Sequence, residues 1–203
     1  MPMLSLEPAT SEMSQLLRRV VDEMLGWATP NPGYSLGDLI DHVGKLALAF
    51  TDAATKNVDP LSGPTPVGDA EHLGPDWRTR IPRDLAALAA AWQDPSAWTG
   101  QTRAGGVDLP GEVAAVVAMN ELVVHGWDVA VASGQRLSPD PAILAAVHGY
   151  LVQTRAGHPG ATAGLGPAVA VPADRPLLDQ VIGLAGRDPG WRPPASAAAD
   201  PGR

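Results

Sequence analysis

The chain has 203 residues and a formal net charge of −8, with 45% apolar and 18% charged side chains. This composition is that of a globular protein with a sizeable core and excludes an intrinsically disordered chain. An acidic surface repels phosphate backbones, which argues against nucleic acid as a partner. The chain has no cysteine, which excludes disulfides, thiolate metal sites and a cysteine nucleophile.

The apolar segments indicate a cytoplasmic protein with no membrane partner. Residues 1–7 lack the basic region and the long apolar stretch of a secretion signal. No run reaches the roughly 18 uninterrupted apolar residues of a membrane span. Aromatic residues make up only 4% of the chain, so Ala, Val and Leu have to fill the core. Small aliphatic side chains suit close helix packing.

The first two predicted helices are separated by a Pro/Gly-rich break. Apolar residues recur at helical spacing over residues 11–25, and the prolines and glycine of residues 30–33 then end the pattern. Ser35 is a good N-cap for the second helix, and Asp38 completes a capping box with the shorter acid. His42 lies one turn later, beside the apolar ridge of that helix.

Long irregular segments alternate with the remaining predicted helices. Residues 57–79 are rich in Pro and Gly and are expected to form a long loop, a type of segment that often has a function. Residues 94–110 are also expected to be irregular. We expect one domain over residues 1–190 and a flexible tail over 191–203. The remaining helices are predicted over residues 82–93, 111–132, 141–154 and 176–186.

The helix predicted over residues 111–132, GEVAAVVAMNELVVHGWDVAVA, is apolar nearly all round, which places it in the middle of a bundle. From residue 113 onward its only ionisable side chains are Glu121, His125 and Asp128. Glu121 and His125 are four residues apart, so they share one face at roughly 6 Å along the axis. Burying a lone carboxylate costs several kcal/mol, and a divalent cation would satisfy both side chains.

His42 is a candidate third ligand, because helical bundles build metal sites from side chains on facing helices. Three protein ligands leave an open position for water or substrate, as in catalytic metal sites. Two plainer interpretations stay open on spacing alone. Glu121 and His125 could form a hydrogen-bonded core pair, and His42 could be a buried histidine with an ordinary partner.

Two further polar residues have open roles. Asp128 could orient a ligand imidazole or cap a neighbouring backbone group. His72, in the long loop, could line the mouth of the site or simply be solvated. The chain has no G-x-S-x-G, no P-loop and no dinucleotide fingerprint. No catalytic residue and no nucleotide cofactor are therefore assigned.

Four segments carry a family resemblance: TPNPGYSLGDLIDHVG, DLAALAAAW, NELVVHGWDVAVASGQ and GPAVAVPADRPLLDQVIGLAGRDPGW. Over residues 11–192 the chain resembles actinobacterial metal-binding proteins related to the N-terminal domain of mycothiol-dependent maleylpyruvate isomerase, in the DinB-like superfamily. The resemblance implies an all-α fold, an antiparallel four-helix bundle with long loops and an extra C-terminal helical segment. It also implies a metal, usually zinc, held by His42, Glu121 and His125, although such ligands also accept nickel, iron or manganese.

The chain departs from the family pattern in two places. Asn31 follows Thr29-Pro30, where the family often has a cysteine. The full isomerase also has a separate C-terminal domain that contributes an arginine to catalysis, and we expect this chain to lack that domain. Isomerisation of maleylpyruvate is therefore not carried over to this chain.

The resemblance implies a metal-dependent enzyme that activates a low-molecular-weight thiol, with mycothiol as cosubstrate, for transfer or isomerisation of a small electrophile. One alternative is a metal-dependent hydrolase, which would need Asp128 or His72 as its general base. The other is a non-catalytic protein that binds a metal or a small ligand. A monomer or a homodimer is expected in each case.

Overall fold

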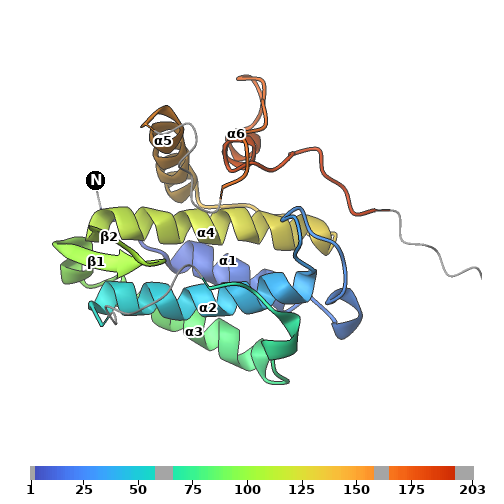
Figure 1. The fold of residues 1–203 in the computed structure, drawn as a ribbon, viewed down its shortest axis with the longest axis horizontal. Helices are drawn as coiled ribbons and strands as arrows, with labels where there is room; N and C mark the ends of the chain where they lie inside the picture. The colour runs from blue at the N-terminus through green and yellow to red at the C-terminus, as the bar shows by residue number, and fades with distance from the viewer. Residues whose placement is uncertain (1–2, 58–65, 158–164, 195–203) are drawn as a thin grey trace, which may run out of the picture.

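The computed structural model describes residues 3–57, 66–157 and 165–194 and is mostly helical, with a small two-stranded sheet (Figure 1). Within these described residues, three 3-10 helices and two strands connect six α-helices. The α-helices are α1 (Glu7–Leu17), α2 (Leu36–Thr55), α3 (Trp77–Ala91), α4 (Gly111–Ala132), α5 (Pro141–Gly157) and α6 (Leu177–Leu184). The shorter elements are η1 (Asp22–Met24), η2 (Ala70–His72), η3 (Pro95–Trp98), β1 (Gln101–Ala104) and β2 (Val107–Pro110).

The core lies between helices α1, α2, α3 and α4. Helix α2 packs against α3 and α4, and α1 packs against the same two helices. Each of the four helices contributes a large, fully buried side chain, namely Met13, Ile40, Ile81 and Met119. Fully burying such a side chain stabilises the fold by about 1.5–3 kcal/mol, so this shared core fixes α2 against α4.

Helix α4 is covered on two sides, which explains its apolar sequence. Figure 1 shows α4 between the α1–α3 layer and the helices α5 and α6, and it contacts both groups. The central position and the bounds predicted for this helix are confirmed. Its length and apolarity would also allow it to cross a membrane, but 83% of the relevant window is buried inside the protein. This burial is that of the core helix of a soluble protein.

The start of α2 is fixed by the predicted capping box. Ser35 Oγ accepts a hydrogen bond from the Asp38 amide (3.2 Å), and Asp38 Oδ2 accepts one from the Ser35 amide (2.8 Å). The segment before η2 docks on this turn, because Asp41 Oδ2 accepts from the Asp69 amide (2.9 Å). A Cβ at Gly68 would lie 2.0 Å from the Asp38 carbonyl oxygen. Only glycine therefore allows this close approach to α2.

The first helix was predicted over residues 11–25 and is found at Glu7–Leu17, so that prediction is wrong in its bounds. A tertiary contact holds the chain just after the helix. Arg78 donates to the Val20 carbonyl oxygen (3.1 Å) and pairs with Asp22 (2.8 Å). Val20 still reaches the core, but from a turn.

The stretch predicted as irregular forms the hairpin β1–β2, which an all-α prediction does not include. Gly105 and Gly106 form its two-residue turn, with φ of 57° and 79°. Two successive positive φ angles are the requirement of a type I′ hairpin turn. The predicted loop 57–79 and tail 191–203 lie partly outside the described residues. The described part of that loop contains η2 and the start of α3.

Candidate metal centre

His42 from α2 converges with Glu121 and His125 from α4. One ligand atom from each residue lies within 4.8 Å of the other two. The two imidazole rings meet edge to face, with centroids 5.0 Å apart. His125 Nε2 lies 3.0 Å from Glu121 Oε2. A divalent ion binds imidazole nitrogen and carboxylate oxygen at about 2.0–2.2 Å, so small side-chain shifts would bring all three atoms within reach of one ion.

Both imidazoles are oriented by a hydrogen bond from Nδ1. The Nδ1–H of His42 donates to the Pro66 carbonyl oxygen (2.6 Å), which can only accept. The Nδ1–H of His125 donates to Asp128 Oδ2 (3.1 Å). This arrangement leaves both Nε2 atoms for a ligand. Histidines that bind metal in proteins nearly always donate their other N–H to a carbonyl or carboxylate in this way. The donor set therefore fits a divalent metal.

The three candidate ligands differ in charge when no metal is bound. Burial and the nearby charge of His125 lower the pKa of His42 to about 4. Burial works against the charged form of His125, but the hydrogen bonds to Asp128 and Glu121 outweigh it and raise its pKa to about 9. Burial would raise the pKa of Glu121, but the hydrogen bond and charge of His125 lower it. At neutral pH the site holds a His125–Glu121 ion pair beside a neutral His42.

Asp128 and Arg187 form a buried pair behind His125. Asp128 is fully buried, and its Oδ2 lies 3.3 Å from Nη2 of Arg187, which is also buried. Asp128 thus orients His125, one of the two roles that the sequence left open. Sequence reasoning missed Arg187. The available signal was that the 113–132 stretch carries two carboxylates, Glu121 and Asp128, but no Lys or Arg, so a second cation beside His125 had to come from another segment.

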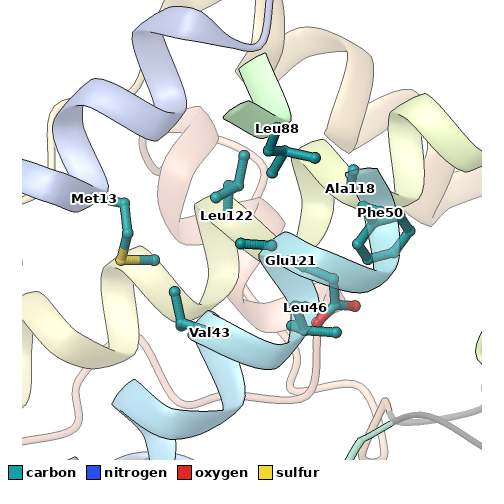
Figure 2. A pocket seen from close by; sticks show the side chains of 9 residues that line it. Met13, Val43, Leu46, Phe50, Leu88, Ala118, Glu121 and Leu122 are labelled. Carbon is teal, nitrogen blue, oxygen red and sulfur yellow. The ribbon is translucent and has the colours of Figure 1, made fainter. Parts of the chain in front are cut away.

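A small apolar cavity of about 10 Å³ lies beside Glu121, between the core helices. Figure 2 shows the Glu121 carboxylate extending from α4 next to Leu46 of α2. The other lining residues are apolar and come from all four core helices: Met13, Val43, Ala47, Phe50, Leu88, Ala118 and Leu122. The Glu121 side chain itself is 25% exposed. Solvent therefore reaches the site at Glu121, whereas the interior offers it no polar partner on the cavity wall.

His72 lies outside this cluster. Its side chain is 70% exposed, and its Nδ1 lies 3.1 Å from Asp69 Oδ2. The structure therefore places His72 at the surface, paired with a neighbour in its own 3-10 turn. Tyr34 borders the site at His42, and the sequence analysis did not indicate it. Its ring meets His42 edge-on at 5.6 Å, and its hydroxyl accepts from the Gly68 amide (3.0 Å).

A family model described as "Mycothiol maleylpyruvate isomerase N-terminal domain" matches residues 6–130, more than half of the chain. The chain belongs to this family. The resemblance stated from the sequence is thereby confirmed. The matched residues of this family member include α1 to α4 almost entirely, and with them His42, Glu121, His125 and Asp128. Helices α5 and α6, and Arg187, lie beyond the matched range.

Two Mycobacterium tuberculosis proteins resemble this member of the maleylpyruvate isomerase N-terminal domain family over nearly its whole length. They are MT0763 of strain CDC 1551 / Oshkosh and Rv0738 of strain ATCC 25618 / H37Rv, both described as uncharacterized. Each is 25% identical over 190 residues, which cover 92% of this chain and 97% of the relative.

Solved structures of mycothiol-dependent maleylpyruvate isomerase share the fold. One crystal structure matches with a TM-score of 0.58 at 22% identity and covers 77% of this chain and 70% of that one. A histidine-to-alanine mutant of that enzyme matches with a TM-score of 0.57 at 21% identity and the same coverage. At this level of identity the likeness establishes a common, mostly helical fold.

Proposed function

We propose that the chain is a metal-dependent enzyme that activates a low-molecular-weight thiol, mycothiol, for transfer to or isomerisation of a small electrophile. The single observation that carries the proposal is the convergence of His42, Glu121 and His125 within 4.8 Å, with both imidazoles held through Nδ1. The thiol is inferred from the names of the family and of its solved relatives.

Each ligand residue has a defined task in this proposal. His42 and His125 present Nε2, because Pro66 and Asp128 occupy their Nδ1–H groups. Glu121 supplies one negative charge, so a divalent ion would keep a net positive charge among its protein ligands. That charge lowers the pKa of a thiol bound to the ion, as metal coordination does for thiols generally. The chain's lack of cysteine means that no thiol of its own competes for the ion.

The ligand count favours an enzyme over a storage or structural site. Among the described residues, the cluster at this position has three members. Asp128 does not add a fourth, because its Oδ2 bonds Nδ1 of His125, on the far side of the ring from Nε2. Three protein ligands leave a position for substrate. The partly exposed Glu121 marks the side from which a substrate would enter.

The hydrolase alternative gains no support from the candidate bases. Asp128 is fully buried and already bonded to His125 and Arg187. His72 is exposed and paired with Asp69. A general base has to reach the water or hydroxyl whose proton it takes. Neither residue is so arranged.

The proposal has further parts that concern the whole molecule. We propose zinc as the metal, a cytoplasmic location, and a single DinB-like domain over residues 1–190. We also propose that α1 to α4 form the antiparallel four-helix bundle of that superfamily. The mutual packing of α1 and α2 with α3 and α4 supports this bundle.

The test uses cobalt as a spectroscopic substitute for zinc. Cobalt-loaded protein is titrated with mycothiol, and a sulfur-to-cobalt charge-transfer band is expected at about one equivalent of bound thiol. His125→Ala should lose the band, whereas His72→Ala, the exposed histidine outside the site, should keep it. Thiol consumption with model electrophiles then measures transfer. If mycothiol neither produces the band nor binds by calorimetry, the thiol mechanism is wrong.

A further inference from the structure

Arg187 is a buried guanidinium surrounded by acceptors from three segments of the chain. Its Nη2 donates to Asp128 Oδ2 on α4 (3.3 Å) and to Asn31 Oδ1 before α2 (3.1 Å). Its Nη1 donates to the Ala185 carbonyl oxygen (3.2 Å). Arg187 itself follows α6, 59 residues after Asp128. The segment after α6 therefore meets the segment before α2 directly behind His125.

The bonds of Asp128 make its orientation depend on Arg187. Oδ2 accepts from both His125 Nδ1 and Arg187 Nη2, whereas the buried Oδ1 has no hydrogen-bond partner among the residues that the structure describes. Within the described part of the chain, the hydrogen bonds that hold the carboxylate are therefore those to Oδ2. If Arg187 is removed, His125 alone remains to hold Asp128. The carboxylate then loses one of the two described hydrogen bonds that set its position against the imidazole.

A buried arginine is a costly way to attach a segment, because its desolvation has to be offset by the bonds that it makes. Arg155 of α5 secures the same region by donating to the carbonyl oxygens of Leu184 (2.6 Å) and Gly166 (2.7 Å). Arg187 differs from Arg155 in reaching a carboxylate that contacts a candidate metal ligand. This difference separates a task at the metal centre from attachment of the C-terminal segment.

We propose that Arg187 is a positioning residue of the metal centre. It fixes Asp128, and Asp128 fixes the imidazole of His125 with Nε2 toward Glu121 and His42. The inference rests on the metal site of the proposed function. It makes the segment after α6, which lies beyond the residues matched by the family model, a working part of that centre.

The experiment measures metal affinity on the full chain by competition with a chelator, for folded protein as judged by circular dichroism. Arg187→Met should weaken zinc binding about 10–100-fold, the usual effect of removing a group that orients a metal ligand. Arg187→Lys keeps the positive charge but lacks the planar guanidinium, so its zinc affinity should lie between that of the wild type and that of Arg187→Met. The matched control, Arg155→Met, should change the affinity by less than about twofold, because the hydrogen bonds described for Arg155 go to backbone carbonyl oxygens and not to Asp128.

Two readouts separate positioning from stability. The cobalt ligand-field spectrum should change in Arg187→Met and stay as in the wild type in Arg155→Met. Asp128→Asn and Arg187→Met should also be non-additive in metal affinity, because they break one chain of bonds. If Arg187→Met does not fold, the same double-mutant test of additivity is made with Arg187→Lys and Asp128→Asn.

Three outcomes would overturn the inference: wild-type affinity in the Arg187 variants, an equal loss in Arg155→Met, or additive effects of the Asp128 and Arg187 changes. A wild-type chain that binds zinc but no thiol refutes the proposed function and leaves this inference intact. A wild-type chain that binds no divalent metal refutes both.

Discussion

Metal binding to the chain should release about one proton at pH 7, because one ligand of the site is protonated in the metal-free protein. The pKa of His125 is raised to about 9 by its bonds to Asp128 and Glu121, against the effect of burial. A metal can bind only the neutral imidazole, so His125 has to lose its proton. His42, whose pKa is lowered to about 4, is already neutral. Glu121, whose pKa is lowered, is already ionised.

The size of the effect follows from these values. With a pKa of about 9, roughly 1 in 100 His125 side chains is neutral at pH 7. The apparent affinity should therefore be about 100-fold below its limit at high pH and should rise about tenfold from pH 6.5 to 7.5. An unperturbed histidine with a pKa near 6.5 would give a rise of less than about twofold over the same interval.

Isothermal titration calorimetry in buffers of different ionisation heat counts the released protons, and chelator competition at pH 6.5 and 7.5 gives the affinity. His72→Ala, which changes an exposed histidine outside the site, should reproduce the wild-type values. An affinity that does not change with pH, with no proton released, would refute the reasoning. That result would mean that His125 is neutral in the metal-free protein and that the ion pair with Glu121 is absent.

Three further predictions concern the metal-free fold and its loops. The free energy of unfolding should be largest near pH 6.5. The raised pKa of His125 contributes about 3 kcal/mol of stability that is lost as the pH rises from 6.5 to 9. The lowered pKa of His42 removes about 3 kcal/mol as the pH falls from 6.5 to 4. Gly68→Ala should displace its segment from α2, because its Cβ would lie 2.0 Å from the Asp38 carbonyl, and should weaken metal binding about tenfold by loosening the Pro66–His42 bond. Ser35→Ala should lower the free energy of unfolding by about 1 kcal/mol through loss of the N-cap.

Denaturant unfolding across pH checks the first and third of these predictions, and chelator competition checks the second. A stability maximum above pH 8 would contradict the charges assigned to His42 and His125. Wild-type metal affinity in Gly68→Ala would show that the Pro66 carbonyl is not needed to orient His42. Gly26→Ala is the control, because Gly26 has no positive φ and no atoms within 4 Å of an added Cβ; it should keep the wild-type affinity.

Much of the candidate site could be predicted from the sequence, because α4 is apolar nearly all round and carries few ionisable side chains. Its apolar surface made Glu121, His125 and Asp128 stand out, and four-residue spacing placed the first two on one face. The capping box at Ser35 marks where α2 begins, and so the position of His42 along that helix. The pairing of α2 with α4 came from the family resemblance, since no local pattern specifies which helices face each other.

The remaining features depend on contacts between distant segments. The chain just after α1 is held by Arg78, 58 residues away from the Val20 carbonyl that it binds. The hairpin turn at Gly105 and Gly106 joins strands of four residues each, too short to show a period of two. Arg187 reaches Asp128 only because α6 packs beside α4. The chain has 14 Lys and Arg residues, and no spacing rule selects one of them as the partner of Asp128.

The metal content of the purified chain tests the central claim most directly. Elemental analysis of the wild type should find about one divalent ion per chain, as expected for a single site with three protein ligands. His125→Ala and His42→Ala should each lose it, while His72→Ala should retain it. Full metal content in His125→Ala, or a wild-type chain that binds no divalent ion after incubation with zinc, would contradict the assignment.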